Sequence, residues 1–118
     1  MYEVIAYRKA DGEVPIETFL NGLPLKLREK TLRALQLLEE WGPRLGGEES
    51  AYLRDGIFEL RTRFGSDITR VFYFFVIGKK IVLTNGFVKK SQKTPPREIE
   101  RAIRYKKDWE GRHEGMEA

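Results

Sequence analysis

Residues 81–90 of this chain read Ile-Val-Leu-Thr-Asn-Gly-Phe-Val-Lys-Lys, and residues 91–96 continue with Ser-Gln-Lys-Thr-Pro-Pro. The first eight of these residues are mostly apolar or β-favouring, which predicts a strand well inside a sheet. Lys89 and Lys90 at its end place fixed positive charge at one edge of that sheet. Ser91 and the Thr-Pro-Pro sequence then predict a turn and the start of a helix. A rigid strand that ends in cations suits a site that holds an anion.

Two further strands are predicted directly before this one. The first, Ile57 to Phe64, alternates between apolar side chains on one face and charged side chains on the other, namely Glu59, Arg61 and Arg63. The second, Ile68 to Ile77, is apolar on both faces, which is typical of a central strand. Short glycine-containing turns join the three strands, so we expect an antiparallel meander.

The rest of the chain supplies one strand and three helices. Alternation predicts a strand over Tyr2 to Tyr7, and apolar spacing predicts helices from Pro15, from Leu25 to Trp41 and from about Pro96. We expect the inner face of the long helix to consist of Leu32, Leu35 and Leu38. Residues 44–50 have the composition of a polar loop. The order β-α-α-β-β-β-α predicts an α+β fold, with a mainly antiparallel sheet and helices packed on one face.

The overall composition predicts one basic globular domain. A length of 118 residues is close to the commonest domain size, so we expect a single domain spanning residues 1–118. Charged residues make up 34% of the chain and hydrophobic residues 41%, which indicates a folded protein rather than a disordered one. The net charge of +4 and the pI of about 9.4 favour an acidic partner, either nucleic acid or an acidic protein.

Two absences limit the chemistry that this chain can perform. It has no cysteine, which excludes a disulfide framework, a zinc–thiolate site and a catalytic thiol. Its one histidine, His113, lies in a polar tail, about residues 111–118, that we expect to be frayed. A mechanism that needs a histidine pair is therefore disfavoured. Because neither a signal-peptide pattern nor an apolar run of about 20 residues is present, we expect a cytoplasmic protein.

Arginines on the predicted meander form the first candidate site. Arg61 and Arg63 point away from the core, and a solvated sheet face is the simple explanation. If Gly65-Ser66 form a two-residue turn, Arg61 lies directly opposite Arg70, where like charges destabilise a sheet. A phosphate, or an acidic residue of a partner, between the two guanidinium groups would explain such a pair. A three-residue turn would instead place Arg70 opposite Thr62 on the other face, and the sequence leaves both registers open.

Tyr73 and the two terminal lysines form the second candidate set. Tyr73 is either a core aromatic or a base-stacking or proton-donating residue. Lys89 and Lys90 are neighbours on a strand, so at most one of them faces a given site. They are either a charged strand end or part of that site. A lysine crowded by arginines has its ammonium form disfavoured, which lowers its pKa and suits a general base.

Basic helix faces form the third candidate set. The outer face of the last helix carries arginines that either form a solvated, salt-bridged surface or contact phosphates: Arg97, Arg101 and Arg104. The first half of the long helix is also basic, through Lys26, Arg28, Lys30 and Arg33.

Three motifs of this chain resemble the RelE/HigB superfamily of toxins, and most closely its phage-derived, HigB-like branch. The motifs are Leu53 to Arg61, Arg70 to Tyr73, and Gly86 to Lys90 followed by Gln92 to Pro95. They occur in the expected order, and the resemblance covers about residues 2 to 110.

The resemblance implies a small ribonuclease of a toxin–antitoxin pair that cleaves mRNA, in many members at the ribosomal A site. It also implies an inhibitory antitoxin, in this branch usually a helix-turn-helix protein, and no metal or other cofactor. Catalytic roles carry over by motif position to Arg61, Arg70, Tyr73, Lys89 and Lys90. RNA contacts are expected from Arg63, Lys93, Arg97, Arg101 and Arg104.

One departure from some HigB-type relatives affects the expected mechanism. Those relatives use histidines, and the motifs of this chain contain none. Lysine or tyrosine would then perform the proton transfers. The alternative function is a catalytically inactive module of the same fold that binds an antitoxin, nucleic acid or both. A phage structural component is a third and weaker hypothesis.

Overall fold

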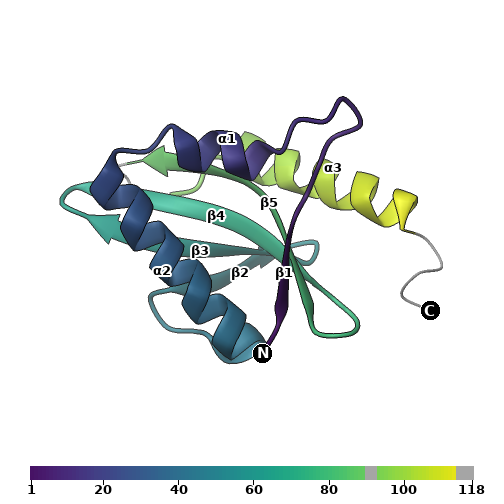
Figure 1. Ribbon diagram of the computed structural model, residues 1–118, viewed down its shortest axis with the longest axis horizontal. Helices are drawn as coiled ribbons and strands as arrows, with labels where there is room; N and C mark the ends of the chain where they lie inside the picture. The colour runs from purple at the N-terminus through teal and green to yellow at the C-terminus, as the bar shows by residue number, and fades with distance from the viewer. Residues whose placement is uncertain (90–92, 114–118) are drawn as a thin grey trace.

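The computed structural model describes residues 1–89 and 93–113. The elements, in chain order, are β1 (Glu3–Ala6), α1 (Pro15–Asn21), α2 (Leu25–Trp41), the short 3-10 helix η1 (Gly42–Arg44), β2 (Ser50–Arg54), β3 (Ile57–Phe64), β4 (Asp67–Val76), β5 (Lys80–Lys89) and α3 (Pro96–Arg112) (Figure 1). The strands form one sheet in the order β1-β5-β4-β3-β2. β1 pairs with β5 in parallel, and the other neighbours are antiparallel. The predicted α+β class and mainly antiparallel sheet are confirmed.

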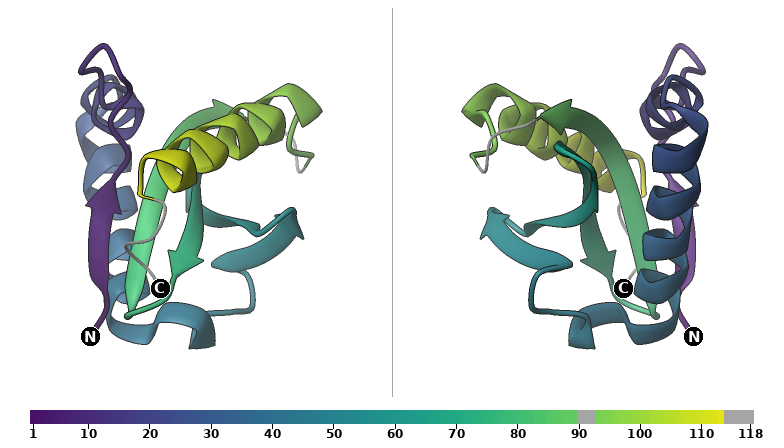
Figure 2. Two further views of the ribbon diagram at one scale, coloured as in Figure 1. Left: turned by 90° about the vertical axis from the view of Figure 1, so that its right-hand side faces the viewer. Right: turned by 90° about the vertical axis from the view of Figure 1, so that its left-hand side faces the viewer.

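Helices cover both faces of the sheet, which corrects the expected packing on one face (Figure 2). α1 and α2 pack on one face, where Ile16 and Leu38 join Val71 of β4 in a buried cluster. α3 packs on the other face, where Trp109 joins Phe72 in a second cluster. The physical reason is that β4 is apolar on both faces, so each face needs a cover.

A fifth strand, β2, occupies the sheet edge next to β3 and was not predicted. It is short, it has a register shift between Tyr52 and Arg54, and Tyr52 is largely exposed. A short edge strand of this kind lacks the apolar alternation that identifies a strand in a sequence. Its first residue, Ser50, ends the segment that the sequence indicated as a loop.

The two long helices end where the sequence predicted, or close to it, and in α2 the predicted inner face is confirmed for Leu35 and Leu38 but not for Leu32. In α2 the buried residues are Leu27, Thr31 and Leu38, whereas Leu32 is 43% exposed. Leu32 lies about 100° around the helix from Thr31 and therefore turns away from the sheet. No helix within residues 1–89 and 93–113 is long and apolar enough to cross a membrane.

The end of α3 differs from the expected frayed tail. The helix continues to Arg112, and the ring of His113 stacks on Trp109, with 4.0 Å between the ring centroids. The backbone N–H of His113 also donates to the carbonyl of Trp109. Residues 111–113 are therefore part of the folded structure, and residues 114–118 lie outside the described part of the chain.

Candidate functional site

The β3–β4 hairpin places two arginines side by side on the face that α3 covers. Phe64 pairs with Asp67, so Gly65 and Ser66 form a two-residue turn, and Arg61 pairs directly with Arg70. The structure thus selects the register that brings the two arginines together. Gly65 has a φ of +62°, a backbone conformation that glycine adopts without steric cost.

An acidic residue of this same chain lies between the two arginines. The Oε2 atom of Glu59 accepts a hydrogen bond of 2.9 Å from Nη1 of Arg70, and it lies 3.7 Å from Nε of Arg61. The Oε1 atom accepts a 2.6 Å hydrogen bond from the hydroxyl of Thr94, in the segment that leads into α3. We name Glu59, Arg61, Arg70 and Thr94 the arginine cluster.

Burial divides the arginine cluster into an inner and an outer part. The side chain of Arg70 is fully buried and that of Glu59 is 4% exposed, whereas the side chain of Arg61 is 22% exposed. Removing one partner of a buried ion pair typically costs about 3–5 kcal/mol, because the other charge remains buried without compensation. The inner pair therefore holds the site together, and Arg61 is the member of the cluster that a ligand from solvent can reach.

A small pocket of about 180 Å³ opens beside Arg61. Arg61 and Arg63 line it together with Glu48 and Glu49 from the loop before β2. The backbone N–H of Arg61 donates to the carbonyl of Glu49 at 2.8 Å, which fixes that loop against β3. Its lining thus combines two guanidinium groups, which attract a phosphate, with two carboxylates, which repel it.

A β-bulge in β5 decides where Lys89 lies. Between the pairs Tyr73–Leu83 and Val71–Gly86, β5 contains one residue more than β4. Because side chains alternate along a strand, the extra residue moves everything after it to the opposite face. Lys89 then pairs with Ile68, and it shares a face with Arg70. Without the bulge, Lys89 would lie on the face of Leu83.

The bulge is held by polar contacts. The hydroxyl of Thr84 donates to the carbonyl of Phe72 at 3.3 Å, and the side-chain amide of Asn85 donates to the carbonyl of Glu98 at 3.5 Å. The site therefore acquires a lysine through a distortion that α3 helps to stabilise. The second predicted lysine, Lys90, lies outside the described residues.

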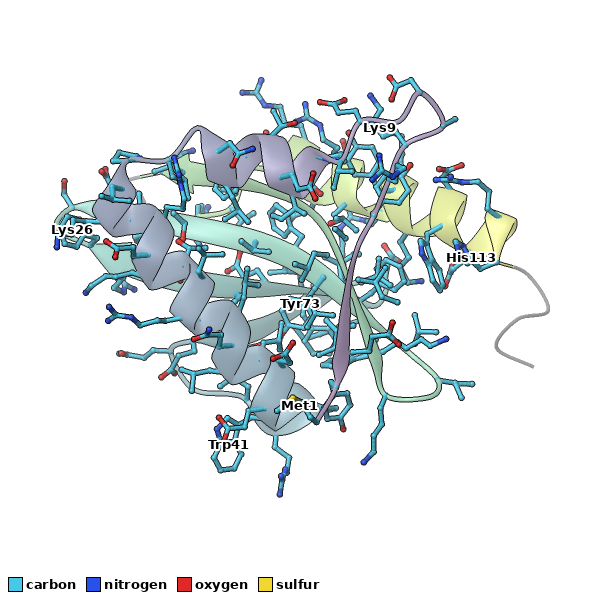
Figure 3. All side chains as sticks on the ribbon, in the orientation of Figure 1. Met1, Lys9, Lys26, Trp41, Tyr73 and His113 are labelled. Carbon is cyan, nitrogen blue, oxygen red and sulfur yellow. The ribbon has the colours of Figure 1, made fainter. Side chains whose placement is uncertain are left out.

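Tyr73 does not join the arginine cluster. It is three residues from Arg70 and so lies on the opposite face, where it is 1% exposed and packs in the cluster under α1 and α2. Its hydroxyl shares a 2.5 Å hydrogen bond with the hydroxyl of Ser50, and burial raises its pKa, an effect that this bond opposes. Figure 3 shows Tyr73 in the interior of the molecule. The core interpretation of Tyr73 is confirmed, and a direct catalytic role does not fit its position.

The remaining predicted RNA-binding residues are distributed along the segment before α3 and along α3 itself. Lys93 is exposed and directly precedes Thr94. Arg97, Arg101 and Arg104 are exposed, and Arg101 lies 3.6 Å from a carboxylate oxygen of Glu98. Arg104 lines a separate pocket of about 650 Å³ between α3 and the β2–β3 turn, whose charged lining residues have both signs. The outer face of α3 is thus partly a salt-bridged surface rather than a continuous cationic one.

Sequence reasoning missed two members of the arginine cluster, Glu59 and Thr94. Glu59 was placed on the correct face, two residues before Arg61, but it was not recognised as the internal counter-ion of the arginines. One signal was available in the sequence. Glu59 alternates with Arg61 on one face of β3, so it is the acidic residue nearest to the place where Arg61 and Arg70 would meet. Thr94 gave no signal beyond a turn before two prolines.

Comparison with known families identifies the group to which this fold and site belong. A family model described as "Phage derived protein Gp49-like (DUF891)" matches residues 18–107, which include the whole arginine cluster. This family is RelE-like and is associated with toxins of toxin–antitoxin systems. No curated protein matches the sequence. Because the match spans well over half of the chain, the protein belongs to the Gp49-like family of phage-derived proteins.

Proposed function

We propose that this protein is the toxin of a type II toxin–antitoxin system and an endoribonuclease of the HigB-like branch that cleaves mRNA on the ribosome. The observation that carries the proposal is the arginine cluster, in which two guanidinium groups lie opposite each other on one sheet face and one of them is accessible. Membership of a toxin-associated family supports the same function.

The proposed reaction needs no metal or cofactor. The ribose 2′-hydroxyl gives up its proton and its oxygen attacks the adjacent phosphorus. The bond from phosphorus to the 5′-oxygen breaks as that oxygen takes up a proton, which leaves a 2′,3′-cyclic phosphate and a free 5′-hydroxyl. Arg61 contacts the scissile phosphate and stabilises the charge that develops on it. One positioned donor of this kind is typically worth about 10²–10³ in rate.

The other predicted catalytic residues take different roles in this proposal. Arg70 is a positioning residue, because it is buried and acts on Arg61 through Glu59. Lys89 shares the face of Arg70 and serves as base or as electrostatic stabiliser, and Lys90 remains a candidate for the same role. Tyr73 is removed from the catalytic set. Arg63, Lys93 and the arginines of α3 would contact the RNA backbone.

The absence of histidine from the site supports a role for the ribosome. A lysine is a weak acid–base catalyst near neutral pH, so correct alignment of the 2′-oxygen must supply much of the acceleration. Binding of the mRNA on the ribosome provides such alignment. The protein would then act in the cytoplasm, and a helix-turn-helix antitoxin would hold it inactive.

A second function, an inactive binding module, is favoured by one specific observation. Arg70 is completely buried and already paired with Glu59, so only Arg61 of the two opposed arginines is accessible to a phosphate. A module of this kind would bind its antitoxin or nucleic acid without turnover.

Expression of the protein without its antitoxin separates the two functions. Wild type should arrest growth, and primer extension on cellular mRNA should reveal discrete new 5′ ends. Arg61→Ala should remove both effects, whereas Arg44→Ala, at an exposed arginine in η1, should retain them. Growth arrest without new 5′ ends would support the binding module and contradict the enzyme.

A further inference from the structure

A second cationic surface lies on the first half of α2, which the proposed reaction does not use. Lys26, Lys30 and Arg33 follow one another at spacings of four and three residues, so they share one helix face. All three are exposed, and none of them forms an ion pair with an acid among the described residues. Together with Glu29 and Phe64 they line a pocket of about 310 Å³.

Phe64 gives this surface an aromatic component. It is the last residue of β3 and is 43% exposed, although its alternation with Leu60 predicts a core position. The ammonium group of Lys30 lies 5.5 Å from the centroid of the Phe64 ring. An exposed aromatic ring among unpaired cations is the combination that binds single-stranded nucleic acid, because bases stack on the ring and phosphates contact the cations.

Arg28 shows that these cations are not simply part of a uniformly basic helix. Its guanidinium group donates to the carbonyls of Asn21 and Leu23, at 3.0 and 3.2 Å. Arg28 therefore holds the connection between α1 and α2. Within residues 1–89 and 93–113, the three exposed cations form no such hydrogen bond, and Lys30 contacts only the ring of Phe64. Their charges are available to a ligand.

The surface on α2 and the pocket beside Arg61 meet β3 at two neighbouring residues near the β3–β4 turn. Phe64 directly follows Arg63 on β3, and the two side chains lie on opposite faces of the strand. Arg63 lines the pocket beside Arg61, and Phe64 lines the pocket beside α2. Figure 3 places Lys26 at the end of the molecule where the β3–β4 hairpin turns. A single strand held at Arg61 can thus pass over the hairpin turn and reach α2.

We propose that Lys26, Lys30, Arg33 and Phe64 form a second binding site for single-stranded RNA, which holds nucleotides that flank the cleaved position. The cations contact backbone phosphates, and one base stacks on the ring face of Phe64 opposite Lys30. The identification of this RNA as the substrate rests on the proposed function. An acidic protein segment would also match the charges. RNA is the ligand that uses the exposed ring as well, and a strand bound beside Arg61 would bring it to this end of β3.

Binding can be measured separately from cleavage with a labelled RNA of about ten nucleotides that is 2′-O-methylated throughout, a length that suits a single-strand site. Its blocked 2′-oxygens cannot attack the phosphates, so fluorescence anisotropy reports affinity alone. Loss of binding in the variants therefore tests the second site whether or not the wild-type protein cleaves unmodified mRNA.

The expected results differ between the two components of the site. Lys30→Gln should lower the slope of log affinity against log salt by about 0.7, and loss of all three cations should lower it by about 2. Phe64→Leu should weaken binding about tenfold at unchanged slope. Lys79→Gln, an exposed lysine at the opposite end of β4, is the matched control and should change neither quantity.

Two results would overturn the assignment. Equal effects of Lys30→Gln and Lys79→Gln would show that only the net charge of the protein matters. A poly-glutamate probe that binds as tightly as the RNA, and loses the same affinity in Phe64→Leu, would instead identify a site for an acidic protein segment. Unchanged thermal unfolding of Phe64→Leu is needed to attribute its effect to stacking.

Discussion

The two faces of β4 carry polar groups of different kinds, and the difference separates the site from the core. On the face under α3, Arg70 forms a charged pair with Glu59 and supports the accessible Arg61. On the face under α1 and α2, Tyr73 forms a neutral hydrogen bond with Ser50 and is closed to solvent. A buried charge needs a partner of opposite charge, and it can act on a ligand only through a residue that solvent reaches, here Arg61. A buried hydroxyl needs only one hydrogen-bond partner.

The largest effect on stability is expected from Glu59→Ala. This change leaves the guanidinium group of Arg70 buried without its carboxylate, and the free energy of unfolding should fall by about 3–5 kcal/mol. Chemical denaturation followed by circular dichroism measures the change. Replacing both residues by methionine should recover much of the loss, because no charge then remains buried. A loss below about 1 kcal/mol in Glu59→Ala would show that the pair does not hold the site together.

A smaller effect, and one confined to stability, is expected from Tyr73→Phe. The substitution removes one buried hydrogen bond with Ser50, so the free energy of unfolding should fall by about 1 kcal/mol. Growth arrest and mRNA cleavage should remain at the wild-type level once folding is corrected for. A loss of cleavage without a loss of stability would restore Tyr73 as a proton donor and remove the distinction between the two faces.

An effect confined to alkaline pH concerns Tyr7, a neutral polar group on the charged face. Burial, followed by its 2.6 Å hydrogen bond to Asp108, raises the pKa of Tyr7 to about 12. Because the folded pKa exceeds the unfolded value of about 10, the folded state retains a proton that the unfolded state loses. The contribution of Tyr7 to the free energy of unfolding is fully present below a pH of about 10, and it is lost as the pH rises towards 12.

Tyr7→Phe tests this dependence. Its unfolding free energy should decline less than that of wild type over the same alkaline range, when both are measured by denaturation at a series of pH values. Tyr73→Phe is a useful comparison, because burial raises the pKa of that tyrosine as well. Identical alkaline profiles for wild type and Tyr7→Phe would contradict the role of the bond to Asp108.

The sequence predicted the elements better than it predicted their faces. Alternation and apolar spacing located α2, β3 and the start of α3, because these depend on local residue pattern. The side of the sheet that α3 covers depends on the path of the chain from β5 to α3. The local residue pattern does not determine that path.

The position of Lys89 illustrates the same limit within the site. Simple alternation from Leu83 would place Lys89 on the face of Tyr73, and the bulge at Thr84 and Asn85 moves it to the face of Arg70. One inserted residue in a strand reverses every later side chain, and nothing in the local composition marks the insertion. The pairing of Arg61 with Arg70, in contrast, followed from a turn length that the sequence limited to two alternatives.

The central claim is that the arginine cluster cleaves RNA through Arg61. The most direct test incubates purified wild type, Arg61→Ala and Arg44→Ala with mRNA on ribosomes, and measures both the rate of cleavage and the chemistry of the new 3′ end. We expect a 2′,3′-cyclic phosphate from wild type and from Arg44→Ala, and a rate about 10²–10³ lower for Arg61→Ala. Cleavage by Arg61→Ala at the wild-type rate, or no cleavage by wild type, would contradict that claim.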